Sequence, residues 1–214
     1  FSVAWFLVNF KNSRQPIYEK LRAFLDFVAG ISVGIICIGL FPFIAIALKM
    51  SSPGQIFYKQ KRVGQGGTEF FLYKFRSMYV LKEDGSAEID GAQFTMKDDK
   101  RVTAIGKFLR KTRLDELPQF INLLKRDITL IGPRPERPEI VQQAVARLPY
   151  YSLRHMVRPG LTGWAVIRQN YTDNLEKTLQ KLQYDLYYIK HRSVLMDISI
   201  LLRTVNIVLR MMGQ

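Results

Sequence analysis

The stretch FVAGISVGIICIGLFPFIAIAL, residues 27–48, decides how the rest of the chain is placed, because none of its 22 residues carries a charge. About 20 consecutive apolar residues suffice to cross the hydrocarbon core of a bilayer. Pro42 lies inside the stretch and lacks the N–H of a helical hydrogen bond, so it predicts a kink or a break near Phe41. We therefore expect a membrane element that changes direction at Pro42.

Basic residues on both sides of this stretch predict how it meets the membrane. They are Lys11, Arg14, Lys20 and Arg22 before it, and Lys49, Lys59, Lys61 and Arg62 after it. A spanning helix usually has its basic flank on the cytoplasmic side only. The symmetry favours a re-entrant hairpin that returns to the same face, while a true span and a buried core helix stay open as alternatives.

Two glycines and one aspartate in or beside the apolar stretch are not assigned a specific function. Gly30 and Gly34 have the small-xxx-small spacing that permits close helix packing, but chance explains so short a match more simply. Asp26, at the mouth of the apolar run, is interpreted as an interfacial residue.

The charge balance of the chain indicates an anionic partner. Its 214 residues, enough for one domain and an appendage, include 32 Lys and Arg against 18 Asp and Glu, a formal net charge of +14. Nucleic acid, a phosphorylated substrate and an anionic membrane surface all fit such an excess. The single cysteine, Cys37, excludes an intramolecular disulfide, and two histidines are too few for a His-rich metal site.

The remainder of the chain is expected to be mostly helical with a small β-hairpin, which is an α+β fold. Alternating apolar and polar residues around a glycine-rich turn predict the hairpin over 54–78. A polar loop over 80–100 and an extended, turn-rich segment over 157–167 are also predicted. The predicted helical segments are 101–127 in two pieces, a helix from the proline-rich connector to about Arg147, 175–190 and 195–212.

The last of these segments combines a broad apolar surface with a narrow polar stripe. Arg203, Asn206 and Arg210 recur at i, i+3 and i+7 among Ile, Leu, Val and Met. Such a helix typically lies in a membrane interface. A core helix is the alternative that the sequence leaves open.

Two adjacent carboxylates, Asp115 and Glu116 in the stretch KTRLDELPQF, are the candidate reactive groups. Because neighbouring helical residues point about 100° apart, they cannot face each other as a glycosidase pair does. One interpretation is structural: Asp115 caps a helix, Glu116 interacts with the helix dipole, and Pro118 lies in the first turn.

The chemical interpretation depends on the basic residues around this pair. They are Arg110, Lys111 and Arg113 before it, and Arg134 and Arg137 on the connector LIGPRPERPEIV. Arginines near a helix N-terminus bind phosphate, and their field keeps Asp115 ionised, as a carboxylate nucleophile requires. Asp115 and Glu116 together offer the oxygen donors that Mg²⁺ prefers. These parts predict phosphoryl transfer.

Five motifs occur in one order along the chain. They are YKFRSM (73–78), FLRKTRLDELPQFINLLKRD (108–127), LIGPRPERPE (130–139), VRPGLTGWAVI (157–167) and KLQYDLYYIKHRSVLMDISILLRTV (181–205). Their order resembles the bacterial sugar transferases, the monotopic polyprenyl-phosphate phosphoglycosyl transferases that start exopolysaccharide and O-antigen synthesis. The chain is most similar to the catalytic part of large members, whose preceding membrane helices the apolar start at 1–10 resembles.

The resemblance implies a mechanism. Asp115 attacks the β-phosphate of a UDP-sugar, UMP leaves, and a phosphosugar-aspartate intermediate forms. Polyprenyl (undecaprenyl) phosphate then attacks this intermediate and gives a polyprenyl diphosphate sugar. Glu116 serves Mg²⁺ and the geometry of the pair, and the site lies at the cytoplasmic face of the bacterial inner membrane.

The resemblance also implies roles for other residues. Arg134 matches the phosphate-binding arginine of the family, and Arg110 matches a basic residue needed near the site. Lys74 and Arg76 lie in the KFRSM strand, which is expected to face the diphosphate. Asp185 falls within a family motif without an assigned role.

The implied organisation has three regions. They are the end of a membrane helix with a juxtamembrane linker (1–23), the re-entrant hairpin (24–48), and a catalytic domain with interfacial C-terminal helices (49–214). The expected partners are the UDP-sugar, polyprenyl phosphate and an anionic lipid membrane, and a homodimer is compatible with them. Nucleic acid is not expected, because an acidic pair lies inside the basic region and no nucleic-acid motif is present.

The chain departs from the family pattern at three positions. Phe41 stands where serine often precedes the hairpin proline, Arg126 stands where glycine is usual, and Lys100 where proline is common. None of these changes touches the acidic pair. Two other functions stay open: a glycosyltransferase that moves the sugar alone and releases UDP, and a basic membrane-surface binding module without catalysis.

Overall fold

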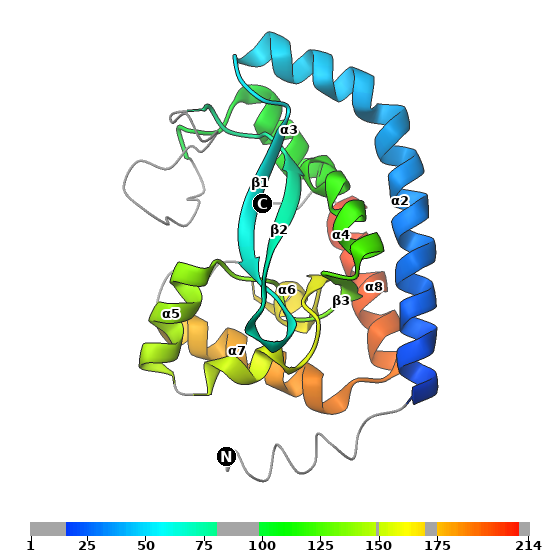
Figure 1. Cartoon of the computed structure of the whole chain (residues 1–214), viewed down its shortest axis with the longest axis vertical. Coiled ribbons are helices and arrows are strands. Elements are labelled where there is room, and N and C mark those ends of the chain that lie inside the picture. The colour runs from blue at the N-terminus through cyan, green and yellow to red at the C-terminus, as the bar shows by residue number, and fades with distance from the viewer. Residues whose placement is uncertain (1–15, 81–98, 149, 170–174, 210–214) are drawn as a thin grey trace.

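The computed structural model describes residues 16–80, 99–148, 150–169 and 175–209. Helix α2 (Pro16–Ser51) runs along one side of the molecule, and a two-stranded hairpin and a group of shorter helices lie beside it (Figure 1). Most of the described residues are helical, as predicted. The expected membrane-helix end at 1–10 and most of the expected loop over 80–100 lie outside the described residues.

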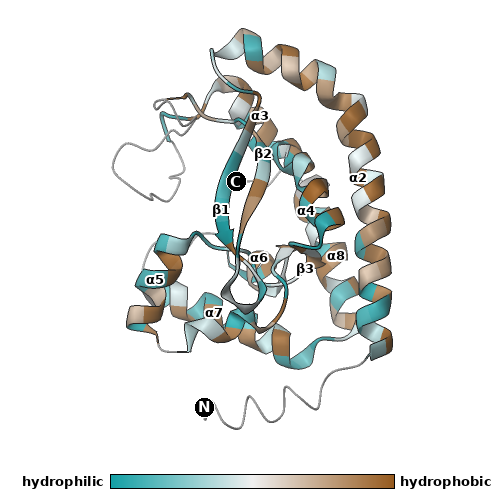
Figure 2. Ribbon diagram, in the orientation of Figure 1, coloured by the Kyte–Doolittle hydropathy of each residue, from teal (hydrophilic) through white to brown (hydrophobic). Residues whose placement is uncertain are grey.

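One face of α2 is buried along the whole helix. The buried residues are Tyr18, Asp26, Gly30, Gly34, Cys37, Ile44 and Leu48. Their spacings of three, four, seven and eight residues keep them on one side of the helix. The opposite side exposes large apolar residues, among them Ile17, Phe24, Ile35, Ile38 and Phe43. Figure 2 shows apolar residues along most of α2, which is the one described helix long and apolar enough to cross a membrane.

Gly30 and Gly34 let α2 approach α4 (Phe120–Lys125) closely. A Cβ at Gly30 would lie 2.8 Å from Leu124 Cδ2, and one at Gly34 would lie 3.0 Å from Phe120 Cδ2. Larger residues would hold the two helices apart. The interpretation of this spacing as a chance match is therefore wrong.

Helix α2 continues through Pro42 without an interruption. The predicted break is absent, and the helix bends instead, so that its last third turns across the end of the molecule (Figure 1). A proline ring clashes with the preceding turn and removes one hydrogen bond, and a bend relieves the clash without ending the helix. Phe41, beside the proline, stacks on Phe57 of the hairpin with ring centroids 5.6 Å apart. This stacking holds the bend against the hairpin.

The predicted hairpin is confirmed. β1 (Phe57–Val63) pairs antiparallel with β2 (Glu69–Phe75), with Phe57 opposite Phe75 and Val63 opposite Glu69. Its turn contains Gly66 and Gly67, whose φ angles of 68° and 81° suit glycine because it has no Cβ.

The Asn122 side chain joins α4 to the free edge of β2. Its Nδ2 donates to the carbonyl oxygen of Phe71 (2.7 Å), and its Oδ1 accepts from the backbone N–H of Tyr73 (3.2 Å). The amide thus makes the two bonds that a neighbouring strand would make, and Asn122 is fully buried. This contact places the segment before α4, with its acidic pair, next to β2.

The segment predicted to form two helical pieces forms three short elements. They are α3 (Ala104–Thr112), the 3₁₀ helix η2 (Leu114–Gln119) and α4. The acidic pair lies in η2, at the join that the sequence predicts. Arg113, with φ 60°, is the left-handed residue at which the chain turns from α3 into η2.

A second pair of strands was not predicted. β3 (Thr129–Ile131) runs parallel to β4 (Gly160–Thr162), and the segment after β4, predicted to be extended, forms the short helix α6 (Trp164–Arg168). Strands of three residues are too short for an alternating pattern to show. Their close crossing requires glycine, since a Cβ at Gly160 would lie 2.0 Å from the backbone nitrogen of Gly132.

The remaining helices close the domain. They are α5 (Pro138–Arg147), the 3₁₀ helix η3 (Tyr151–Met156), α7 (Leu175–His191) and α8 (Val194–Leu209). Helices α5, α7 and α8 confirm the predicted helical segments; the predicted end of the last one, including Arg210, lies outside the described residues. A core of Ile131, Val157, Tyr188, Ile189 and Ile200 joins β3, α7 and α8.

Arg126 offers a test of the turn after α4. It has φ 64° where glycine is usual in the family, and left-handed backbone costs a residue with a Cβ about 1–2 kcal/mol. Since glycine also makes the unfolded chain more flexible, we expect Arg126→Gly to stabilise the fold by up to about 1 kcal/mol. Thermal unfolding in detergent measures this change. The matched control is Lys125→Gly, in the last turn of α4, which should destabilise instead; equal effects of both substitutions would contradict the prediction.

Candidate active site

Glu116 is the centre of the charged cluster on η2. Three cations approach its Oε1: Arg134 Nη2 at 2.7 Å, Lys74 Nζ at 3.0 Å and Arg113 Nη1 at 3.5 Å. Its side chain is 10% exposed. Burial alone raises the pKa of Glu116, but the three cations outweigh it and hold that pKa well below its usual range. Glu116 is therefore a fixed negative charge.

Asp115, its neighbour, lies in a different environment. Its side chain is buried, and its Oδ1 is a buried oxygen without a hydrogen-bond partner in the described structure. Burial raises the pKa of Asp115, while the charge of Lys74 opposes this shift. A buried carboxylate with an uncommitted oxygen is a poorly solvated anion, which is a good state for a nucleophile.

The backbone of η2 sets the directions of these two side chains. The residue that caps η2 is Arg113, in left-handed conformation, and it makes no side-chain capping hydrogen bond. Asp115 and Glu116 both lie in the first turn. The structural interpretation of Asp115 as a helix cap is therefore wrong, because Asp115 is the second residue of η2 and Arg113 occupies the N-cap position.

Two elements far from η2 in sequence bring the main cations to Glu116. Lys74 comes from β2, where it pairs with Tyr58 of β1, and Arg134 comes from the connector after β3. Burial lowers the pKa of Lys74, and Glu116 opposes that shift. Glu116 also raises the pKa of Arg134. Lys74 and Arg134, predicted to bind phosphate, are thus brought together at the acidic pair.

A buried ion pair supports the connector that carries Arg134. Arg154, in η3, donates from Nε and Nη2 to Asp185 Oδ2 on α7 (3.1 and 2.7 Å) and from Nη1 to the hydroxyl of Tyr151 (2.7 Å). Its Nη2 also donates to the carbonyl oxygen of Arg134 (2.9 Å). Asp185 is therefore linked to Glu116 through three successive contacts: it orients Arg154, Arg154 holds the backbone of Arg134, and Arg134 pairs with Glu116.

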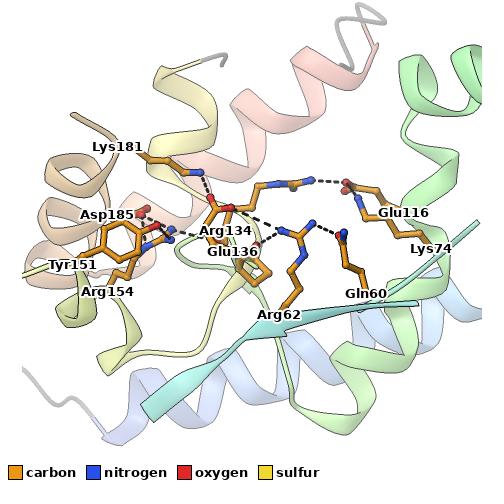
Figure 3. A network of polar contacts seen from close by, with 11 residues as sticks. Gln60, Arg62, Lys74, Glu116, Arg134, Glu136, Tyr151, Arg154, Lys181 and Asp185 are labelled. Atoms are coloured by element: carbon orange, nitrogen blue, oxygen red, sulfur yellow. Dashed lines mark hydrogen bonds and ion pairs between the residues drawn. The ribbon is translucent and has the colours of Figure 1, made fainter. Parts of the chain in front are cut away.

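A second set of contacts holds the same connector from the other side. Arg62 of β1 donates to the carbonyl oxygen of Pro135 (2.9 Å) and faces Glu136, which also pairs with Lys181 of α7. Burial raises the pKa of Glu136, but the charges of Lys181, Arg154 and Arg62 outweigh it and lower that pKa to about 2. Figure 3 shows these contacts as one network that extends from α7 to η2.

The membrane-helix candidate α2 is bonded to the strand that leads into this connector. Asp26 accepts hydrogen bonds from Thr129 Oγ1 (2.7 Å) and the backbone N–H of Leu130 (2.8 Å). Arg22, one turn earlier, donates to Thr129 Oγ1 (3.2 Å) and to the carbonyl oxygen of Ile131. Asp26 is buried, so its interpretation as an interfacial residue is wrong. The sequence feature that could have indicated this role is the spacing of four residues between Arg22 and Asp26, which puts both on one face of a helix.

The other predicted phosphate-binding residues lie elsewhere. Arg76 is buried and donates to three backbone carbonyls at the end of α2, those of Leu48, Ser52 and Pro53. This is a helix C-cap, and we assign Arg76 that structural role in place of the predicted contact with the diphosphate.

Arg110 and Arg137 lie nearer the charged cluster. Arg110 bonds to Ser77 Oγ through Nε (2.8 Å), and its charge acts on Asp115 to lower the pKa. Arg137 is the N-cap residue of α5 and lies close enough to Arg62 to lower the pKa of that guanidinium. Both belong to the positive field of the site, one beside Asp115 and the other beside the connector.

The site offers hard oxygen donors for a cation. No group of three or more His, Cys, Asp or Glu side chains suited to a metal occurs among the described residues. Mg²⁺, however, usually takes only one or two carboxylates together with substrate phosphates. Asp115, with its free Oδ1, and Glu116 fit that requirement.

Comparison with known proteins decides the family. The sequence model of the family described as "Bacterial sugar transferase" matches residues 17–211, nearly the whole chain. The chain belongs to the bacterial sugar transferase family. The predicted family is thus confirmed.

Individual members of the sugar transferase family are also similar over most of the chain. A UDP-N-acetylgalactosamine-undecaprenyl-phosphate N-acetylgalactosaminephosphotransferase of Aeromonas hydrophila is 41% identical over 93% of this chain and 46% of its own length. A UDP-glucose:undecaprenyl-phosphate glucose-1-phosphate transferase of Xanthomonas campestris pv. campestris is 40% identical over 94% of this chain and 40% of its own length. The chain thus spans less than half of these two relatives. It covers 92% of an exopolysaccharide production protein of Rhizobium leguminosarum bv. phaseoli, at 36% identity.

The buried pair of Arg154 and Asp185 yields a stability prediction. Both side chains are almost fully buried, so Arg154→Met or Asp185→Leu alone leaves an uncompensated charge and should destabilise the fold by about 3–5 kcal/mol. The double substitution removes both charges and should recover much of this loss. Urea unfolding in detergent measures the cycle. The exposed pair of Lys61 and Glu69 is the control, with effects below about 1 kcal/mol; a double variant as unstable as the sum of the singles would contradict the prediction.

Proposed function

We propose that this chain transfers a sugar 1-phosphate from a UDP-sugar to polyprenyl phosphate and releases UMP. The observation that carries the proposal is the pairing of a buried carboxylate, Asp115, with the cation cluster around Glu116 in one turn of η2. The names of the two relatives from Aeromonas and Xanthomonas, which are undecaprenyl-phosphate sugar phosphotransferases, support the substrate class.

The proposed reaction has two displacements at one phosphorus atom. An Asp115 oxygen attacks the β-phosphorus of the UDP-sugar, the bond from that phosphorus to the bridging oxygen breaks, and UMP leaves with the electron pair. A phosphate oxygen of polyprenyl phosphate then attacks the same phosphorus and releases the Asp115 carboxylate. Neither step needs a proton, because the attacking and leaving oxygens are both anionic, so a cationic site suffices.

The positions of the cations support this division of roles. Lys74 and Arg134 lie on the Glu116 side of the pair, where they can contact the diphosphate. Asp115 and Glu116 would hold Mg²⁺, which would neutralise charge on the diphosphate and on the departing UMP. Arg154 and Glu136, with their partners, keep the connector that carries Arg134 in place.

The packing of α2 supports a re-entrant placement. The buried face of α2, from Tyr18 to Leu48, packs against β3, α4 and α3, the elements around the acidic pair. Its other face exposes apolar side chains over the same length. A helix that spans a bilayer has the membrane along its whole length, which would place these polar elements inside the hydrocarbon core. We therefore propose that α2 enters one leaflet, bends at Pro42 and returns to the same face, the cytoplasmic face of the bacterial inner membrane.

Helix α8 supports the same membrane placement. Its exposed residues include Leu195, Ile198, Leu202 and Val205 together with the charged Arg203, whereas Ile200 is fully buried. A helix with one apolar face in the core and another in solvent is typical of a membrane interface. Tyr18 of α2 donates to Asp197 of α8 (2.7 Å), so the two helices adjoin where we place the membrane surface.

The released nucleotide tests the reaction. Purified protein incubated with Mg²⁺, undecaprenyl phosphate and a panel of UDP-sugars should release UMP with at least one donor, because the proposed attack is at the β-phosphorus. Chromatography distinguishes UMP from UDP, and the responding donor identifies the sugar. Release of UDP would contradict the proposal and favour a glycosyltransferase that moves the sugar alone.

The nucleophile is tested by Asp115→Asn. We expect this variant to lose turnover by at least about 10³-fold, since an amide cannot form the intermediate. It should still bind membranes and give the circular dichroism of the parent. The matched control is Glu69→Gln at the exposed hairpin turn, which should retain activity. Near-normal turnover of Asp115→Asn would remove Asp115 as the nucleophile.

The re-entrant placement is tested with single cysteines at the two ends of α2. Cys37 is buried, so a Cys37→Ala background removes the native thiol, and Ile17→Cys and Met50→Cys introduce exposed thiols at positions 82% and 83% exposed. Both should react with a membrane-impermeant maleimide in inverted membrane vesicles and resist it in intact spheroplasts. Opposite labelling of the two ends would show that α2 spans the bilayer.

A further inference from the structure

The cations of the site all pair with one carboxylate of the protein itself, that of Glu116. Arg134, Lys74 and Arg113 all approach the same oxygen of Glu116, at 2.7, 3.0 and 3.5 Å. Within the described part of the chain, neither Lys74 nor Arg134 forms an ion pair with Asp115. A diphosphate that enters this site therefore meets cations that a carboxylate already holds.

We propose that Glu116 is an internal counter-anion, which competes with the diphosphate of the donor for Lys74 and Arg134. This inference rests on the proposed function, because it assigns a role to Glu116 within the same site. In this role Glu116 keeps the cations ordered, and donor binding exchanges its contacts for contacts to phosphate oxygens. The exchange costs affinity, because a carboxylate beside a bound polyanion repels it.

The surroundings of Glu116 suit such an exchange. Lys74 and Arg134 are partly buried, with side chains 20% and 28% exposed, so an unpaired charge on either would be costly. Glu116 compensates both at once from one oxygen. A phosphate group offers several anionic oxygens and can pair with both cations, which matches Arg134 in particular because its guanidinium binds phosphate with two donors.

The exchange also connects donor binding with the metal. While three cations hold Glu116, a divalent cation beside it meets their repulsion. Transfer of Lys74 and Arg134 to the diphosphate removes part of that repulsion and leaves the Glu116 carboxylate available to Mg²⁺, next to Asp115. Glu116 thus acts first as a counter-anion and then as a metal ligand. Loss of the counter-anion should tighten nucleotide binding, whereas loss of the metal ligand should weaken it when Mg²⁺ is present.

The test measures the affinity for UDP by equilibrium dialysis, once in EDTA and once in Mg²⁺. In EDTA, Glu116→Gln should bind UDP about tenfold more tightly than the parent, because the cations lose their competing anion while the amide keeps the side-chain shape. In Mg²⁺ this gain should shrink, and turnover with the responding UDP-sugar should fall. Tighter binding together with slower turnover is a result that a merely structural residue would not give.

Asp115→Asn is the matched control. It removes one negative charge from the adjacent residue of the same turn, so it reports the general field without the shared contacts of Glu116. We expect a clearly smaller gain in UDP affinity for Asp115→Asn in EDTA. An equal gain would show that net charge alone is responsible and would overturn the inference, as would unchanged or weaker binding by Glu116→Gln.

A charge-balanced comparison keeps the inference testable if Glu116→Gln fails to fold. Lys74→Met and the double variant Lys74→Met with Glu116→Gln differ only in the carboxylate, with Arg134 still present. The double variant should bind UDP more tightly in EDTA than Lys74→Met does, and no difference would overturn the inference. Absence of UDP binding by every protein in both conditions would contradict the proposed donor and this inference with it, whereas UDP binding that is indifferent to Glu116 contradicts the inference alone.

Discussion

The attachment of α2 to β3 is the contact on which the rest of the structure depends. Asp26 and Arg22 bond to Thr129, Leu130 and the carbonyl of Ile131, immediately before the connector that carries Arg134. The helix that we place in the membrane is thereby joined to the phosphate-binding part of the site. Burial of a carboxylate is costly unless its oxygens are hydrogen-bonded, and both oxygens of Asp26 are bonded to β3, so this contact fixes the register of α2 against the domain.

Charge compensation shapes the site itself. The chain carries a large excess of basic residues, and the buried ones around η2 are matched by Glu116, Glu136 and Asp185. Each of these carboxylates meets its cations from a different element of the fold. The exception is Asp115, whose Oδ1 has no hydrogen-bond partner among the residues that the structure describes. The group that we propose as nucleophile is thus the one carboxylate of this set that the network leaves uncommitted, whereas its neighbours order the cations that bind phosphate.

Much of this arrangement could be predicted from the sequence, because some signals are local. The hairpin follows from alternation around Gly66 and Gly67, and the acidic pair at a helical join follows from Pro118 and the flanking basic residues. Other features had no local signal. The pairing of β3 with β4 joins two three-residue strands about thirty positions apart, and Arg154, which bonds to the carbonyl of Arg134, is one basic residue among 32. Arg76 was predicted to face the diphosphate because it lies two residues after Lys74, the spacing that puts side chains of a strand on one face. However, β2 ends at Phe75, and Arg76 bonds instead to the backbone carbonyls after α2.

The sequence by itself determined the family, the apolar helix, the hairpin and the residue types of the site, since each is written in consecutive or periodic residues. Only the tertiary structure decided which cations meet which carboxylate, that α2 continues through Pro42 without a break, and that Gly30 and Gly34 are packing positions. The physical reason is the distance along the chain over which each kind of interaction acts. Helix and strand preferences act over a few neighbouring residues, whereas ion pairing and close packing depend on distances between segments that only the folded chain brings together.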